Sequence, residues 1–179
     1  MRVKEMVMAA LLTALAIIIP TLFGFLRVII GPFTATLAAH TPVILAMFIS
    51  PAAAVFVALG SGLGFLFAGQ PIIVVARAFS HVVFALVGAV MLKRGWNFFL
   101  TMAVTTVLHA VIEGLVVYVM MSAGIGGGDA SAISMALVTT FGTVGHYIVD
   151  ICIAMPIYKA LKETKIVETH SLNYRKLTA

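Results

Sequence analysis

Long apolar runs, separated by short groups of glycine, proline and polar residues, make up most of this chain. A helix needs about 20 apolar residues to cross the hydrocarbon region of a membrane, and fewer where it ends in a cavity. Proline cannot continue a helix from within, so Pro20 and Pro51 mark the ends of the first two runs. The pattern predicts six spans, at about 5–24, 37–50, 52–68, 72–92, 96–122 and 131–161.

The segments between these runs predict loops and turns. Arg27–Thr36 and Gly124–Ser131 are rich in glycine, serine or threonine, and Ala68–Pro71, which contains Gln70, is typical of a tight turn. The third run also contains small residues that predict a slim face for close helix contact, namely Gly60, Gly62 and Gly64.

Composition supports a membrane protein. The 179 residues are 63% hydrophobic and 9% charged, whereas a soluble domain is about 45–50% apolar and about 25% charged. We therefore expect an all-α, integral membrane bundle of six helices, forming a single domain over residues 1–179. The single cysteine, Cys152, excludes a disulfide framework. The N-terminus has the charge order of a signal peptide but lacks a cleavage site, so we interpret it as a retained first span.

Basic residues gather on one side of the predicted bundle, which is the side of both termini if there are six spans. Cytoplasmic loops carry an excess of lysine and arginine, so we expect both termini in the cytoplasm. The opposite side has only Arg27 and, near its face, Arg77. The formal charge of +5 therefore reflects topology and is no sign of nucleic-acid binding. The basic residues on the terminal side are Arg2, Lys4, Lys93, Arg94, Lys159, Lys162, Lys165, Arg175 and Lys176.

Six ionisable side chains interrupt the last three apolar runs. A charge at the bilayer centre costs about 2.5–3.5 kcal/mol on insertion scales, so such residues usually face a bundle interior or a wet cavity. An i,i+4 spacing places both members of a pair on one helix face. We expect the three faces to form one shared polar pocket. The pairs are Arg77 with His81, His109 with Glu113, and His146 with Asp150.

The predicted depth of these residues ranks their roles. Arg77 and His81 lie nearest the outer surface, where the guanidinium is suited to a substrate carboxylate but could also lie at the membrane interface. The pair His109 and Glu113 forms the expected floor of the pocket, with His146 beside it. These side chains could bind a polar heterocycle, relay protons or fix helix packing.

Asp150 is expected to be a structural partner of His146, and His40 a capping or core histidine. Aromatic residues near the pocket could stack on a flat ring or serve as packing, namely Phe33, Phe67, Phe79 and Tyr147.

Enzyme motifs are missing from the sequence. It contains no His-Glu-x-x-His, Gly-x-Ser-x-Gly or Walker motif, so we expect no catalytic residues and no ATP hydrolysis by this chain. Imidazoles make a metal site from His81, His109, His146 and the carboxylates chemically possible. Because Arg77 would repel a cation, we expect neither a metal nor another cofactor.

The first run also carries the pattern Ala10-x-x-x-Ala14, a flat ridge on which another helix can lie, within this chain or from a partner. With six spans, cytoplasmic ends and a polar pocket on the last three spans, the whole chain resembles the substrate-binding S-component of an energy-coupling-factor transporter. The resemblance implies a bacterial plasma-membrane protein that works with a transmembrane coupling protein and two cytosolic ATPases. It also implies that substrate binds in the outer half of the membrane beneath the outer loops, and that the S-component topples in the membrane to release it inside. Ala10 and Ala14 would contact the coupling protein.

Within that family, Pro32–Pro42 and Met47–Pro51 are similar to the niacin-specific S-component. The resemblance implies a small vitamin, nicotinate, whose carboxylate could meet Arg77 and whose ring nitrogen could meet His81 or His109. The expected ligand contacts are Arg77, His81, His109, Glu113, His146, Tyr147, Phe33, Thr34 and Gln70. Another vitamin, a modified-base precursor or a metal ion remain alternative substrates. A proton-coupled carrier is a further alternative, although such carriers usually show an inverted repeat that is not visible here.

Overall fold

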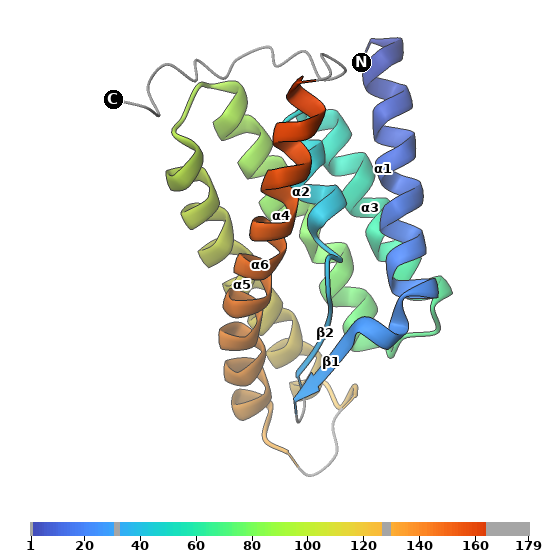
Figure 1. Ribbon diagram of the computed structural model, residues 1–179. Coiled ribbons are helices and arrows are strands. Elements are labelled where there is room, and N and C mark those ends of the chain that lie inside the picture. The colour runs from blue at the N-terminus through green and yellow to red at the C-terminus, as the bar shows by residue number, and fades with distance from the viewer. Residues whose placement is uncertain (1, 31–32, 127–129, 164–179) are drawn as a thin grey trace.

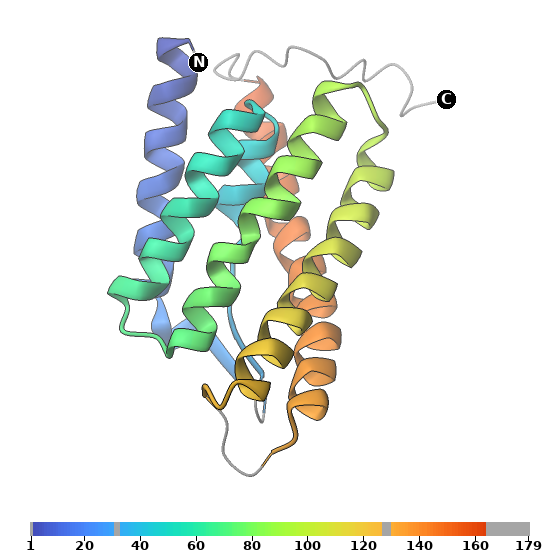
Figure 2. The same cartoon turned by 180° about the vertical axis from the view of Figure 1, so that it is seen from behind.

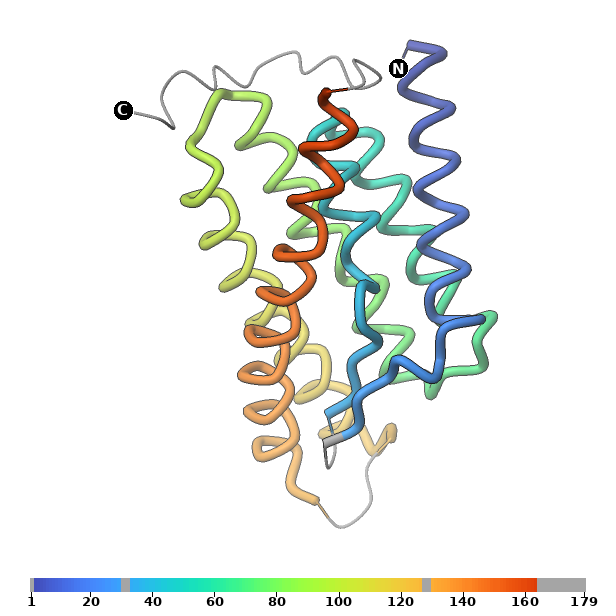
Figure 3. Tube along the Cα trace, viewed as in Figure 1, coloured from blue at the N-terminus to red at the C-terminus, as the bar shows by residue number. Residues whose placement is uncertain are grey.

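The computed structural model describes residues 2–30, 33–126 and 130–163 as a helical bundle with a small hairpin at one end (Figure 1). The start of α1 and the end of α6 lie at the other end of the bundle (Figure 3). Helix α3 (Pro51–Phe67) is apolar but shorter than the membrane-length helices. Four helices are long and apolar enough to cross a membrane: α1 (Val3–Leu22), α4 (Ile72–Lys93), α5 (Phe98–Ser122) and α6 (Ala132–Glu163).

Helices that follow one another in the chain also pack together. Helix α3 lies between α1 and α4, and α5 lies between α4 and α6. The glycines of α3 make this packing close, because a Cβ atom on Gly64 would come within 2.7 Å of the backbone of Ala16 and Ile17 in α1. Gly60 faces Thr13 of α1, and Gly62 faces the ring of Phe79 in α4. The prediction of a slim glycine face is confirmed.

The expected second span, 37–50, is not a continuous membrane-spanning helix, so that part of the six-helix prediction is wrong. The segment contains a turn at residues 37–40 and then α2 (Thr41–Met47), a helix of 7 residues. A helix of that length is only about 10 Å long. All residues of α2 are buried, and the helix contacts α1, α3, α4 and α6. Its sequence is apolar because it lies inside the protein.

The turn before α2 has a specific cause in the backbone. Ala38 has a φ of 65°, in the left-handed region that non-glycine residues seldom adopt. The Asp150 carboxylate of α6 accepts hydrogen bonds from the backbone N–H groups of Ala38 (2.8 Å) and His40 (2.9 Å). Non-helical backbone at membrane depth is tolerated where protein surrounds it and satisfies its polar groups.

The expected loop at Arg27–Thr36 is a two-stranded antiparallel hairpin, after a short 3-10 turn, η1 (Gly24–Leu26). Strands β1 (Arg27–Ile30) and β2 (Phe33–Thr36) pair Val28 with Ala35 and Ile29 with Thr34. Their β-branched residues favour strand conformation. Strand β2 packs against α6, and Figure 2 shows the hairpin from behind, at the bundle end opposite the start of α1. The interior beneath it is therefore covered by a structured lid.

Some residues used for the sequence predictions lie outside the described residues. They include part of the glycine loop, part of the hairpin connection and three basic residues used to orient the chain: Gly127, Gly128, Pro32, Lys165, Arg175 and Lys176.

Candidate functional site

Buried ionisable side chains from α4, α5, α6 and the turn before α2 meet in one cluster inside the bundle. All three predicted pairs contribute to it, so the residues that sequence spacing placed on three helix faces lie together. His109 and Asp150 are 1% and 0% exposed, which places the centre of the cluster well away from lipid. Its strongest contacts join different helices, and these contacts could not be read from spacing within one helix.

Glu113 of α5 is the centre of the larger half of the cluster. Its Oε2 atom accepts a hydrogen bond from Nη2 of Arg77 at 2.8 Å and another from the hydroxyl of Thr143. Its Oε1 atom lies 3.3 Å from Nε2 of His81 and 3.4 Å from Nε2 of His109. One carboxylate therefore ties α4, α5 and α6 together, with the cation on one oxygen and the imidazoles on the other.

Asp150 of α6 is the centre of the smaller half. Besides the two backbone N–H groups of the turn, its carboxylate lies 2.9 Å from Nδ1 of His40. His146, the expected partner, is farther away, with its Nε2 atom 3.6 Å from Oδ2. The prediction of a structural role for Asp150 agrees with this arrangement, but its main partner is His40 and the turn beside it.

His40 joins the two halves. Its Nε2 atom lies 3.3 Å from Nε2 of His81, and its ring centroid lies 4.6 Å from those of His81 and His109. The residue is at the N-cap position directly before α2, but its side chain makes no capping hydrogen bond. The ring instead occupies the middle of the cluster.

A small polar cavity lies between the cluster and the hairpin. Its volume is about 20 Å³, which is room for about one water molecule. Both the hairpin and the loop before α4 contribute to its wall. Its polar lining comprises Arg27, Thr34, Thr36, His40, Gln70, Arg77, His81, Glu113 and His146.

The predicted aromatic contacts are divided between the site and other parts of the bundle. Phe33 of the hairpin lies over the Arg77 guanidinium, 5.8 Å from ring centroid to Cζ. Tyr147 is fully buried behind the cluster and its hydroxyl donates to Thr105, so it does not line the cavity. Phe67 is 67% exposed and Phe79 packs against Gly62, so neither belongs to the site.

Sequence reasoning missed Thr143 and the central place of His40. Thr143 belongs to a row of buried residues on α6 with i,i+4 spacing, Thr139, Thr143 and Tyr147, which faces α5. That spacing is a usable signal in an apolar helix. No comparable signal exists for His40, because its neighbours in the cluster are all at least 41 residues away in sequence.

The alanines of α1 divide between two faces. Ala9 and Ala16 are buried, whereas Ala10 and Ala14 are exposed on the outer face of the helix. Packing within the chain therefore does not occupy the Ala10–Ala14 ridge in the described residues. Its contact with a partner remains a prediction.

Comparison with known proteins found one informative relative. The chain is 35% identical over 170 residues to the niacin transporter NiaX of Lactococcus lactis subsp. cremoris, and the match covers 90% of this chain and 76% of that protein. No protein-family model matches the sequence. No solved structure matches it either.

Proposed function

Because the chain belongs to the family of the niacin transporter NiaX, we propose that it is the membrane subunit that captures nicotinate for uptake. Membership agrees with the sequence resemblance to a niacin-specific S-component, and with transport instead of catalysis. The protein is a multi-pass protein of the bacterial cell membrane. We further propose that nicotinate binds on the outer side and is released inside, and that partner proteins supply the energy.

The observation that carries the proposal is the buried guanidinium of Arg77 at the wall of a polar cavity. Glu113 occupies Nη2 of Arg77, while Nε has no hydrogen-bond partner among the described residues. A guanidinium offers five N–H donors in a planar fork that fits a carboxylate. Phe33 lies over this group, and His81 lies beside it at the cavity wall. Together they supply a carboxylate partner, an aromatic face and a nitrogen partner for a pyridine ring.

Entry of nicotinate requires the lid to move. The cavity holds about one water molecule, which is less space than a pyridine carboxylate needs. Strand β2 supplies Thr34 and Thr36 to the wall, and the Phe33 ring holds that strand against Gly142 of α6. We therefore propose that the hairpin lifts from α6 to admit substrate and closes over it afterwards.

Release to the cytoplasm is proposed to depend on partners. The exposed Ala10–Ala14 ridge of α1 is a flat surface on which a transmembrane coupling protein can lie. Two cytosolic ATPases would supply the energy, as the sequence resemblance implies. Co-purification with these partners separates this function from a stand-alone proton-coupled carrier, which would catalyse uptake in vesicles without them.

Calorimetry of nicotinate binding to the purified protein tests the proposal. A hydrogen bond to a charged group is worth about 1.5–3 kcal/mol, so Arg77→Ala is expected to weaken nicotinate binding at least tenfold, and Arg77→Lys less. Binding of nicotinamide, which lacks the carboxylate, should be less affected by either change. Arg94→Ala is the matched control, because Arg94 is exposed beyond the end of α4. Unchanged nicotinate affinity in a folded Arg77→Ala protein would contradict the assigned role.

A further inference from the structure

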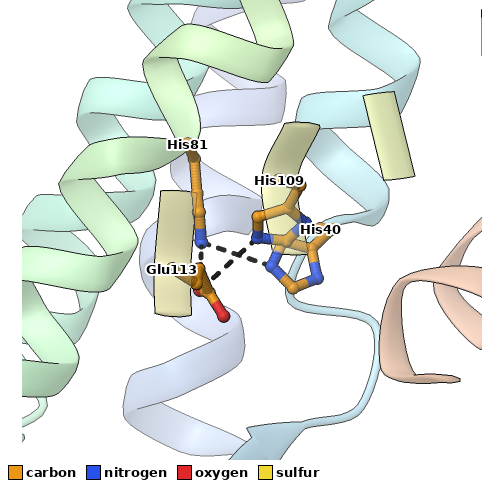
Figure 4. Close-up of side chains that lie close together, drawn as sticks. All are labelled: His40, His81, His109 and Glu113. Carbon is orange, nitrogen blue, oxygen red and sulfur yellow. Dashed lines mark hydrogen bonds and ion pairs between the residues drawn. The ribbon is translucent and has the colours of Figure 1, made fainter. Parts of the chain in front are cut away.

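We propose that His40, His81, His109 and Glu113 form a binding site for one divalent transition-metal ion, such as Zn²⁺. The four side chains come from the turn before α2, from α4 and from α5, and all four are buried. Figure 4 shows the three imidazole rings and the carboxylate gathered around a common centre. One ligand atom from each residue lies within 4.8 Å of the other three.

The separations between these atoms match a tetrahedral metal site. Zinc–ligand bonds of about 2.0–2.1 Å place neighbouring ligand atoms of a tetrahedron about 3.3–3.4 Å apart. Three separations in the cluster have these lengths. They are 3.3 Å from His40 Nε2 to His81 Nε2, 3.3 Å from His81 Nε2 to Glu113 Oε1, and 3.4 Å from His109 Nε2 to Glu113 Oε1.

The surroundings of His40 prepare it as a ligand. With its proton on Nδ1, the ring donates to the Asp150 carboxylate at 2.9 Å, and Nε2 then directs a lone pair at the cluster. A carboxylate that holds the second nitrogen of a ligating histidine is the usual arrangement around protein-bound metals, because it fixes the tautomer and ring orientation.

His109 provides a second, independent observation. Among the described residues its Nδ1 atom has no hydrogen-bond partner and its Nε2 atom has only the long 3.4 Å contact with Oε1 of Glu113, although the side chain is 1% exposed. Buried polar atoms nearly always have partners, and an exception calls for an explanation such as a bound ion. A metal ion bound to Nε2 would satisfy the nitrogen that faces Glu113.

The expected repulsion between Arg77 and a metal ion is reduced by the position of Glu113. Arg77 and Thr143 both bind Oε2 of Glu113, while the histidines face Oε1. The carboxylate therefore lies between the guanidinium and the metal, and hydrogen bonds to its outer oxygen fix its orientation, as is usual for carboxylates that bind a metal.

Charge links the metal to the substrate, and this link rests on the proposed function. With neutral imidazoles, the buried groups Arg77, Glu113 and Asp150 carry one net negative charge, which opposes entry of an anion and is offset in part by the half-buried Arg27 at the cavity wall. A divalent cation changes this to one net positive charge, and nicotinate then neutralises the site. Because uncompensated charge is costly in a buried site, the metal is expected to raise nicotinate affinity.

Titration of the chelator-treated protein with Co²⁺ alone tests the site. We expect one equivalent to bind and give the intense visible absorption of tetrahedral Co²⁺. His81→Gln and His109→Gln should each lower the affinity at least about tenfold. His146→Gln tests the competing set of His40, His146 and Asp150. Arg94→Ala, exposed beyond the end of α4, is the control that should leave Co²⁺ binding unchanged. The proposal is overturned if the folded wild-type protein does not give this absorption. It is also overturned if His146→Gln abolishes Co²⁺ binding and His109→Gln does not.

Calorimetry with nicotinate forms the second arm. Zn²⁺-loaded protein should bind nicotinate at least tenfold more tightly than metal-free protein. Equal affinity with and without metal overturns the charge link and leaves the proposed function intact. Co²⁺ absorption without any nicotinate binding supports the metal site and contradicts the proposed function. If nicotinate binding takes up a proton in metal-free protein and does not gain from Zn²⁺, protonation compensates the charge and the charge link is overturned.

Discussion

The interface between α1 and α3 and the interface among α4, α5 and α6 hold the bundle together by different means. At the first, Gly60 and Gly64 bring two apolar helices so close that an added methyl group would collide with α1. At the second, Glu113 binds the Arg77 guanidinium and contacts two imidazoles in the interior, and nearby Asp150 of α6 binds His40 and the backbone of the turn before α2. One interface is close and free of charge, and the other is built around charges.

This difference separates packing from binding. Lipid chains are as apolar as leucine, so helices in a membrane associate through close van der Waals contact and hydrogen bonds. The interface between α1 and α3 needs only close van der Waals contact. Burying charges is unfavourable unless they are well paired, and replacing such a pair by apolar residues is often neutral or stabilising. The second interface is therefore better explained by a ligand than by stability.

Glu113→Ala should have the largest effect on the isolated protein. It leaves the buried Arg77 guanidinium unpaired, and breaking a buried pair costs about 3–5 kcal/mol. We expect a reduced free energy of unfolding, measured by unfolding in detergent, together with loss of nicotinate binding.

A double variant sharpens this comparison. Arg77→Met combined with Glu113→Leu removes both charges at once, so much of the stability should return while nicotinate binding stays lost. If the double variant is as unstable as Glu113→Ala, the charges are needed for the fold itself and the contrast between the two interfaces fails.

Gly64→Ala should be the next largest effect, confined to the first interface. The new methyl group meets the backbone of Ala16 and Ile17 at 2.7 Å, so α1 must move away, at a cost of about 1–3 kcal/mol. Thermal unfolding should show the loss, and nicotinate affinity of the folded protein should not change. A parallel Gly145→Ala protein controls for the substitution itself, because nothing lies within 4 Å of that position.

Gly142→Ala should affect binding more than stability. Its methyl group would lie 2.7 Å from the Phe33 ring, which would push β2 off α6 and open the cavity wall. Both this change and Gly145→Ala increase helix propensity. The difference in nicotinate affinity between the two proteins therefore reports the effect of displacing the hairpin. We expect roughly tenfold weaker nicotinate binding for Gly142→Ala. Equal affinities in the two proteins would show that the hairpin does not cover the substrate.

Ala10→Trp should have the smallest effect on the isolated protein, because Ala10 is exposed on α1. Unfolding and nicotinate binding should be unchanged, whereas nicotinate uptake by cells should fall because the ridge no longer admits a partner helix. Ala103→Trp, on the exposed face of α5, is the matched control. Normal uptake by the Ala10→Trp protein would show that this face of α1 does not contact the coupling protein.

Most of the fold followed from the apolar pattern, because five of the predicted segments are the helices α1, α3, α4, α5 and α6, and all of these except α3 are long and apolar enough to cross a membrane. The pattern failed at residues 37–50, since hydropathy reports that a segment is buried and not whether protein or lipid surrounds it. The backbone there is broken by Ala38 and satisfied by Asp150, 112 residues later in the chain. A contact at that distance leaves no local trace in the sequence.

The site was predicted only in part, because its contacts between different helices also leave no local pattern in the sequence. Residues paired by i,i+4 spacing, such as His109 and Glu113, are found from one helix alone. The contacts Arg77–Glu113 and His40–Asp150 depend on how separate helices pack, so Arg77 was expected to be free for a ligand while the structure pairs it with Glu113.

The length of α6 also determines how the molecule meets the bilayer. Its 32 residues extend about 48 Å, whereas the hydrocarbon layer is about 30 Å thick. Even the largest usual tilt, about 40°, cannot immerse such a helix completely. The charged residues Lys159 and Glu163 favour placing its last turns among the lipid headgroups. A thicker membrane would immerse more of α6, so we expect bilayer thickness to change how far from the membrane surface the site lies that this helix helps to build.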